Sequence, residues 1–163
     1  LPIFLLQEAR RNHLEEKAYI FGTIFTLSNR LQLLGDRLDP ELTVKQWLFL
    51  VGVLRCGNPA PTLSEIAACI GSSRQNVKKM ALILNKQGFV SMEKDALDAR
   101  ALRIRLTEAC KDHLKRRERL EFDFIEELFT GFAPQELSAL ADAVQRLEKN
   151  GNNMGRKYEG KGV

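Results

Sequence analysis

Residues 62–107 read TLSEIAACIGSSRQNVKKMALILNKQGFVSMEKDALDARALRIRLT, and this stretch decides the fold. Thr62 and Glu65 have the T-x-x-E spacing of a capping box, which predicts that a helix begins there. Gly71 ends that helix, because glycine adopts the positive φ that a helix end often requires. Ser72 or Ser73 then caps a second helix. The sequence therefore predicts two short helices joined by a tight turn.

The second helix has two different faces. Its apolar positions recur at helical spacing and form one face. These are Val77, Met80, Ala81 and Leu84. Basic and polar residues lie round the rest, and Gly88 ends the helix. A glycine turn between two helices, the second with a basic outer face, is typical of a helix-turn-helix.

The residues after Gly88 change to a period of two. Apolar Leu102, Ile104 and Leu106 alternate with Arg103 and Arg105, which predicts a strand. A second strand is expected near residues 89–93, and the polar residues 94–100 form the tip between them. A hairpin directly after a recognition helix is a wing.

This stretch resembles the MarR family of bacterial winged-helix regulators. The family's wing has D-x-R, a short gap, an aliphatic residue, one further residue and L-T. The matching residues are Asp98, Arg100, Ile104, Leu106 and Thr107, with Ser73 to Val77 and Gly88-Phe89-Val90 agreeing as well. These motifs cover about a quarter of the chain, and a looser resemblance extends over residues 14–148.

One departure from the family lies in the second helix. Leu82 and Ile83 stand where family members commonly carry charged residues, often an aspartate that could pair with the wing. That ion pair cannot form here, so we expect the angle of the wing, or the outer end of the second helix, to differ from the family pattern. The two side chains either pack on the wing or form an exposed apolar patch.

The charge of the chain is concentrated in the predicted DNA-binding segment. Across all 163 residues the formal net charge is only +4. Residues 72–106 alone hold eight basic and three acidic side chains. A basic region on a slightly acidic body is expected for contact with phosphates, although a solvated charged face is the alternative.

Apolar helices are predicted on both sides of this segment. Residues 13–40 show two apolar stripes where a surface helix needs one, and Asp39-Pro40 is expected to end that helix. Thr43 and Gln46 form a capping box for an almost wholly apolar support helix. After the wing, Thr107 caps a helix that becomes rich in phenylalanine, and Pro134 begins another. Excess apolar helix surface at both ends favours a homodimer, which the resemblance also implies; a larger monomeric helical core is the alternative.

The predicted fold class is mainly α with a small β-hairpin wing, a winged helix-turn-helix flanked by N- and C-terminal dimerisation helices. Residues 1–12 form an N-terminal arm or the first turns of a helix. The dimerisation helix follows at 13–40, the DNA-binding domain at 41–107 and the C-terminal dimerisation helices at 108–149. Residues 150–163, rich in glycine and asparagine, are expected to be disordered.

The resemblance implies a transcriptional regulator that binds double-stranded DNA, and family tendency favours a repressor. Its operator would be pseudo-palindromic, and a small aromatic or lipophilic effector would release it. We expect the DNA contacts to come from one set of residues. These are Ser73, Arg74, Gln75, Asn76, Lys78, Lys79, Arg100 and Arg103. We assign no residues to the effector.

Other functions find less support in the sequence. His13 and His113 lack a metal-binding spacing and no catalytic motif is present, so neither an enzyme nor a cofactor is expected. Some family members sense peroxide, and Cys110 lies near a helix N-terminus, where a thiolate is favoured; core positions are the better interpretation for Cys56, Cys69 and Cys110. A winged helix used for protein contact is the third alternative. No apolar run is long enough to span a membrane and no signal peptide is recognisable, so we expect a cytoplasmic protein.

Overall fold

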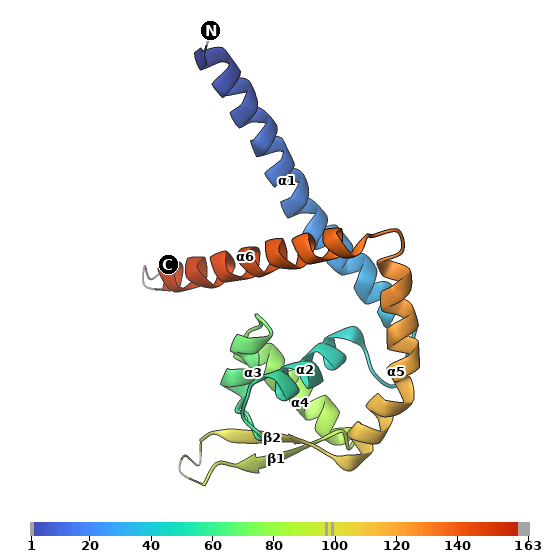
Figure 1. Cartoon of the computed structure of the whole chain (residues 1–163). Helices are drawn as coiled ribbons and strands as arrows, with labels where there is room; N and C mark the ends of the chain where they lie inside the picture. The colour runs from blue at the N-terminus through green and yellow to red at the C-terminus, as the bar shows by residue number, and fades with distance from the viewer. Residues whose placement is uncertain (1, 97, 99, 160–163) are drawn as a thin grey trace. The chain divides into compact units, whose positions relative to one another are not determined.

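The computed structural model describes residues 2–96, 98 and 100–159, with side chains from residue 13 to 157 within those ranges. Its elements follow in the order α1 (Pro2–Gly35), α2 (Val44–Arg55), α3 (Leu63–Cys69), α4 (Arg74–Lys86), β1 (Val90–Lys94), β2 (Leu102–Leu106), α5 (Glu108–Leu128) and α6 (Pro134–Glu159) (Figure 1). The predicted fold class is confirmed. The chain divides into two compact units, residues 1–117 and 118–163.

The predicted helix boundaries in the winged helix are confirmed. Thr62 and Glu65 form a reciprocal capping box at α3, as Thr43 and Gln46 do at α2. Of the two candidate caps for α4, Ser73 is the one used, and its Oγ accepts the N–H of Asn76 at 3.2 Å. The helix ends at Gly71 and Gly88 have φ of 62° and 78°, values that only glycine adopts without strain.

One hydrophobic core holds the winged helix together. Phe49 and Leu50 of α2, Ile66 of α3, Leu84 of α4 and Ile104 of β2 are all almost completely buried. The two strands pair antiparallel from Val90 opposite Leu106 to Lys94 opposite Leu102. The N–H of Ile104 donates to the carbonyl oxygen of Pro61 at 3.0 Å, so the segment before α3 extends the small sheet.

The first helix decides between two alternatives at its start and differs from its prediction at its end. It begins at Pro2, so residues 2–12 are the first turns of a helix, which was one of the two expectations for this segment. It ends at Gly35, before the predicted stop at Asp39-Pro40. A side chain at Gly35 would overlap Val44, so glycine allows the close approach of α2. Asp36 then accepts the N–H of Val44 at 2.7 Å, and the turn at residues 36–38 replaces the last helical turn.

The C-terminal tail is also a correction. The helix α6 continues to Glu159, where disorder was expected from Asn150 onward; residues 160–163 lie outside the described part of the chain. Met154 continues, at helical spacing, the apolar stripe of Leu140, Val144 and Leu147. Once a helix is nucleated, each further residue adds a hydrogen bond, which offsets the low helix propensity of Gly and Asn.

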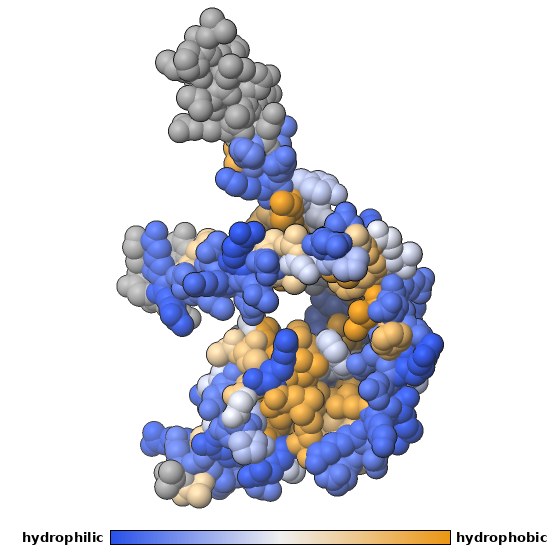
Figure 2. Space-filling view, viewed as in Figure 1, coloured by the Kyte–Doolittle hydropathy of each residue, from blue (hydrophilic) through white to orange (hydrophobic). Residues whose placement is uncertain are grey.

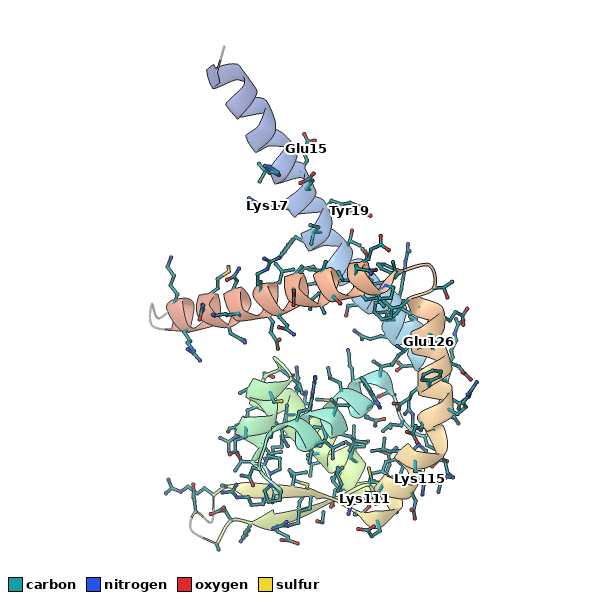
Figure 3. All side chains as sticks on the ribbon, in the orientation of Figure 1. Glu15, Lys17, Tyr19, Lys111, Lys115 and Glu126 are labelled. Atoms are coloured by element: carbon teal, nitrogen blue, oxygen red, sulfur yellow. The ribbon has the colours of Figure 1, made fainter. Side chains whose placement is uncertain are left out.

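Much apolar surface on the flanking helices is exposed within one chain. On α1, Phe21 is 66% and Phe25 58% exposed, and their rings meet edge to face at 5.1 Å. Glu15, Lys17 and Tyr19 project from the same helix (Figure 3). In the second unit, Phe122, Val144 and Leu147 are each about half exposed. None of the described helices combines the length and apolarity that a membrane crossing requires.

A buried charged cluster fastens α5 to the connection between α1 and α2. The Oδ2 atom of Asp39 lies 2.7 Å from His113 Nε2 and accepts a hydrogen bond from Arg117 Nη1 at 3.1 Å. Its Oδ1 atom accepts the N–H of Glu41 at 2.8 Å. Asp39, His113 and Arg117 are each 8% exposed, and the centroid of the His113 ring lies 4.9 Å from that of Phe89, with the rings tilted by 44°.

The cluster sets the charge state of its carboxylate. Burial by itself raises the pKa of Asp39, but the hydrogen bonds from His113 and Glu41 and the charges of His113 and Arg117 outweigh it. The pKa of Asp39 is therefore lower than usual. A carboxyl with a lowered folded-state pKa stabilises the fold above its unfolded value, near 4, and this contribution is lost as the pH falls through the folded value.

We therefore predict that Asp39→Asn lowers the free energy of unfolding by about 3 kcal/mol at pH 7, since it removes the buried negative charge that His113 and Arg117 face. The difference from the parent should narrow below about pH 4. Urea unfolding followed by circular dichroism at pH 7, 5 and 3.5, at one protein concentration, measures this. Asp112→Asn, on the exposed side of α5, is the control. A destabilisation that stays constant across this pH range would contradict the assignment.

Candidate nucleic-acid interface

The recognition helix candidate is α4, and its two faces are separated by burial. Val77, Ala81 and Leu84 point into the core and are 0% exposed. On the opposite side, Gln75 and Lys79 are exposed. Because helical positions three, four and seven apart share a face, further residues lie with these two. They are Lys78, Leu82 and Lys86, all exposed; Arg74, one turn before Lys78, is exposed as well.

The wing tip lies beside the first turn of α4. One surface hollow of about 310 Å³ is lined by both, and it contains two arginines. Its lining is Thr62, Leu63, Ser64, Arg74, Asp98, Arg100, Ala101 and Leu102. Two guanidinium groups at one polar hollow fit contact with an oxyanion, such as a backbone phosphate.

Hydrogen bonds to two aspartates shape the wing tip. Asp95 Oδ1 accepts the N–H of Asp98, and Asp98 Oδ1 accepts the backbone N–H of Arg100, each at 2.9 Å. The N–H of Ala101 donates to the carbonyl oxygen of Asp98 at 2.9 Å. Within the described residues, no ion pair joins Asp98 to Arg100. Asp98 therefore fixes the backbone turn, and the guanidinium of Arg100 is exposed.

Arg103 has a different position from the one expected of a DNA contact. Its Nε donates to Asp95, and its Nη1 donates to the carbonyl oxygen of Ala60 at 3.1 Å and lies 3.7 Å from Glu65. Hydrogen bonds from Thr62, together with the nearby charge of Arg103, lower the pKa of the Glu65 carboxyl. Glu65 therefore remains negatively charged and can pair with Arg103. Arg103 thus fastens the wing to the start of α3, and its guanidinium is engaged within the protein.

The remaining predicted residues divide into three groups. Arg74, Gln75, Lys78, Lys79 and Arg100 lie exposed on the interface described above. Ser73 is the helix cap, and Asn76 lies on the flank of α4. Lys86, which the sequence also placed on the basic outer face, is exposed. Sequence reasoning did not assign Leu82 to that face, although its spacing from Lys78 and Lys79 could have placed it there. It left open whether Leu82 and Ile83 pack on the wing; they are 52% and 48% exposed.

A second hollow, of about 440 Å³, lies on the flank of α4 toward α1 and α2. It combines two lysines with apolar side chains. Its lining is Gln32, Lys45, Leu48, Ile70, Gly71, Ser72, Asn76, Lys79 and Met80. Figure 2 shows hydrophobic side chains gathered over α2 and hydrophilic ones over the wing. Cationic groups combined with an apolar lining fit a small aromatic anion.

The thiols are in environments that oppose reactivity. Cys110 is 1% exposed, and burial raises its pKa to about 11, so the expected effect of the α5 N-terminus does not prevail. The pKa of Cys56 is also raised to about 11, by burial and by a hydrogen bond with Cys69. Cys69 is exposed. Because the thiolate is the reactive form, these raised pKa values disfavour a redox function for Cys56 and Cys110. Within the described residues, no group of three or more His, Cys, Asp or Glu side chains could hold a metal ion.

Solved structures with the same arrangement are MarR proteins. A MarR protein from Peptoclostridium difficile is 24% identical, with a TM-score of 0.77 over 85% of this chain and 91% of that one. The chain has the MarR fold. A MarR transcriptional regulator from Methanosarcina mazei is 19% identical, with a TM-score of 0.74 over 84% of this chain and 99% of that one.

A third MarR-fold structure concerns a regulator whose ligand is known. BpsR from Bordetella bronchiseptica is 16% identical, with a TM-score of 0.69 over 79% of this chain and 92% of that one, and 6-hydroxynicotinic acid regulates its DNA binding. No family model matches the sequence. The matches to these three structures cover 79–85% of this chain.

Proposed function

We propose that the protein is a sequence-specific, duplex-binding transcriptional regulator of the MarR type, acting in the cytoplasm as a dimeric repressor. The observation that carries this proposal is the exposed outer face of α4, with Arg74, Gln75, Lys78 and Lys79 beside Arg100 of the wing. An α-helix with a basic outer face fits the major groove, whose base edges distinguish all four base pairs. An arginine at a wing tip fits the adjacent minor groove.

The exposed apolar helices support the dimer. Large apolar patches on a soluble protein mark surfaces that associate. On α1, α5 and α6 these patches recur at helical spacing, as they do where helices of two copies interlock. A two-fold dimer would present two copies of α4 to one side of the duplex, which is why the operator should be pseudo-palindromic.

The first test measures the molecular mass of the protein in solution and its footprint on DNA. Light scattering at micromolar concentration should give twice the mass of one chain, and half-site centres should lie about 10 base pairs apart. Val144→Asp, on the exposed apolar stripe of α6, should reduce the mass and weaken DNA binding together. Arg146→Asp, on the polar side of the same helix, should leave the mass unchanged. A monomer that footprints a single half-site would refute the dimeric arrangement.

The dependence of DNA affinity on salt concentration distinguishes the roles of the individual residues at the interface. Arg100→Ala should weaken binding most where the flanks are rich in A·T and should lower the salt slope by about one unit, since it removes a groove or phosphate cation. Gln75→Ala should relax base preference within the half-site and leave the salt slope nearly unchanged. Arg103→Ala should weaken binding with no change in slope, because its guanidinium is engaged within the wing. Fluorescence anisotropy titrations at four salt concentrations measure all three.

Asp98→Ala is the control for these titrations. It removes the acceptor for the Arg100 N–H and loosens the tip, so affinity should fall while the slope is retained. Equal losses for Arg100→Ala and Asp98→Ala, both with an unchanged slope, would show that Arg100 only stabilises the hairpin. Retained structure with no duplex binding at moderate salt would instead favour a protein-interaction module.

We further propose that an aromatic anion in the 440 Å³ hollow releases the DNA. Lys79 lines this hollow and also belongs to the outer face of α4, so a carboxylate that pairs with Lys79 withdraws it from a phosphate or base. BpsR, regulated by an aromatic acid, supports this chemical class. The redox alternative has less support, because the raised pKa values of Cys56 and Cys110 oppose the thiolate.

The effector proposal is tested with 6-hydroxynicotinic acid and its uncharged amide. The acid should dissociate the complex at a lower concentration than the amide. Lys45→Ala should weaken the response to the acid about ten-fold, since it removes one charge-assisted hydrogen bond. Lys111→Ala, on α5 (Figure 3), is the control and should respond as the parent does. Equal potency of acid and amide would refute an anion site. Replacing Cys56, Cys69 and Cys110 together by Ser should leave release by the acid intact, whereas a complex that peroxide dissociates in the parent but not in this triple variant would favour redox sensing.

A further inference from the structure

Leu82 is an apolar residue in the middle of a basic helix face. It is 52% exposed, although its own helix buries other aliphatic residues completely, such as Leu84 at 0%. Lys78 and Lys79 precede it by one turn and Lys86 follows it by one turn. At helical spacing these lysines are its neighbours on the surface.

The face on which Leu82 lies is the one available to DNA. Gln75 lies seven residues before Leu82 and shares this face, while Val77 and Ala81 occupy the opposite, buried side. Seven residues of helix rise about 10 Å, which is roughly three base-pair steps of duplex. A helix that places Gln75 on a base edge therefore carries Leu82 along the same groove.

The surrounding charge indicates what covers this side chain. A second protein surface would have to desolvate three neighbouring lysines to bury one leucine, whereas a duplex brings phosphates to the lysines and base edges to the leucine. In the major groove the apolar group on a base edge is the C5-methyl of thymine.

We propose that Leu82 contacts a thymine methyl group in the major groove and thereby specifies an A·T pair, about three base pairs from the base read by Gln75. This inference rests on the proposed DNA-binding function. It assigns a sequence preference to a position where hydrogen-bond readout cannot act, because leucine has no donor or acceptor.

Ile83 provides a matched comparison on the same helix. It is 48% exposed and of equal size, but it lies one turn after Met80 and two turns after Asn76. Those two residues line the 440 Å³ hollow, so Ile83 is on the flank and away from the centre of the outer face.

The experiment removes the methyl group from the DNA. The preferred site is first selected from a random duplex library with the full-length protein. Each thymine of the half-sites is then replaced by deoxyuridine, which keeps the base pair and loses only the C5-methyl. At one position, the replacement in a single half-site should raise Kd about four-fold, the equivalent of burying one methyl-sized group. Replacement at that position in both half-sites should raise Kd by roughly the square of this factor.

The protein variants identify the contacting residue. Leu82→Ala should bind thymine and uracil sites equally, while Leu82→Met should keep the preference because it keeps an apolar side chain of similar size. Ile83→Ala should keep it in full. Circular dichroism checks that each variant retains the parent fold. We expect it to be retained, because both side chains are about half exposed.

The remaining outcomes overturn the proposal in distinguishable ways. A uracil effect that persists in Leu82→Ala assigns the methyl contact to another residue, and no uracil effect at any position shows that no methyl is read. A reduced molecular mass for Leu82→Ala places the side chain at an interface between copies. If the parent selects no sequence from the library, the proposed function fails, and this assignment fails with it.

Discussion

One buried carboxylate, that of Asp39, connects parts of the chain that are far apart in sequence. It binds His113 and Arg117, which lie 74 and 78 residues away. Through the His113 ring it reaches Phe89, at the end of α4 and the start of the wing. Such a cluster contributes modest net stability, because desolvation offsets the attraction, but its geometry is strict. It therefore holds the first part of α5, up to Arg117, against the connection between α1 and α2.

The helix α5 has two features on which the proposed function depends. The helix α5 begins next to the wing, where Thr107 Oγ1 donates to the carbonyl oxygen of Gly88 at 2.6 Å and accepts the N–H of Cys110 at 3.2 Å. Its later residues, such as Phe122, expose apolar surface suited to association.

Three sides of α4 have three different roles. The inner side packs in the core, the outer side carries the proposed DNA contacts, and one flank lines the hollow proposed for the effector. Lys79 belongs to both of the last two. A ligand can shift an equilibrium only by its difference in affinity for two states. A residue shared by both proposed sites provides such a difference without movement of a distant element.

Local patterns in the sequence were sufficient for the elements and most of the interface. Capping boxes, glycine helix ends and the alternation in β2 depend on residues within a few positions of one another, and so they predict α2, α3, α4 and the wing correctly. Helical spacing likewise placed Arg74, Gln75, Lys78 and Lys79 on the exposed face. The prediction of disorder for residues 150–159 was wrong, because it gave more weight to the glycine and asparagine content than to the apolar stripe that Met154 continues.

Only the tertiary structure decided how distant side chains meet. Nothing near Arg103 in the sequence distinguishes it from Arg105, yet Asp95, Ala60 and Glu65 engage the first. The Asp39 cluster and the hollow between α2 and α4 have no sequence pattern either. The exposure of Leu82 was similarly undetermined until the wing was in place. The physical reason is the same in each case: periodicity and capping act along one helix or strand, whereas burial and ion pairing depend on where the folded chain brings other segments.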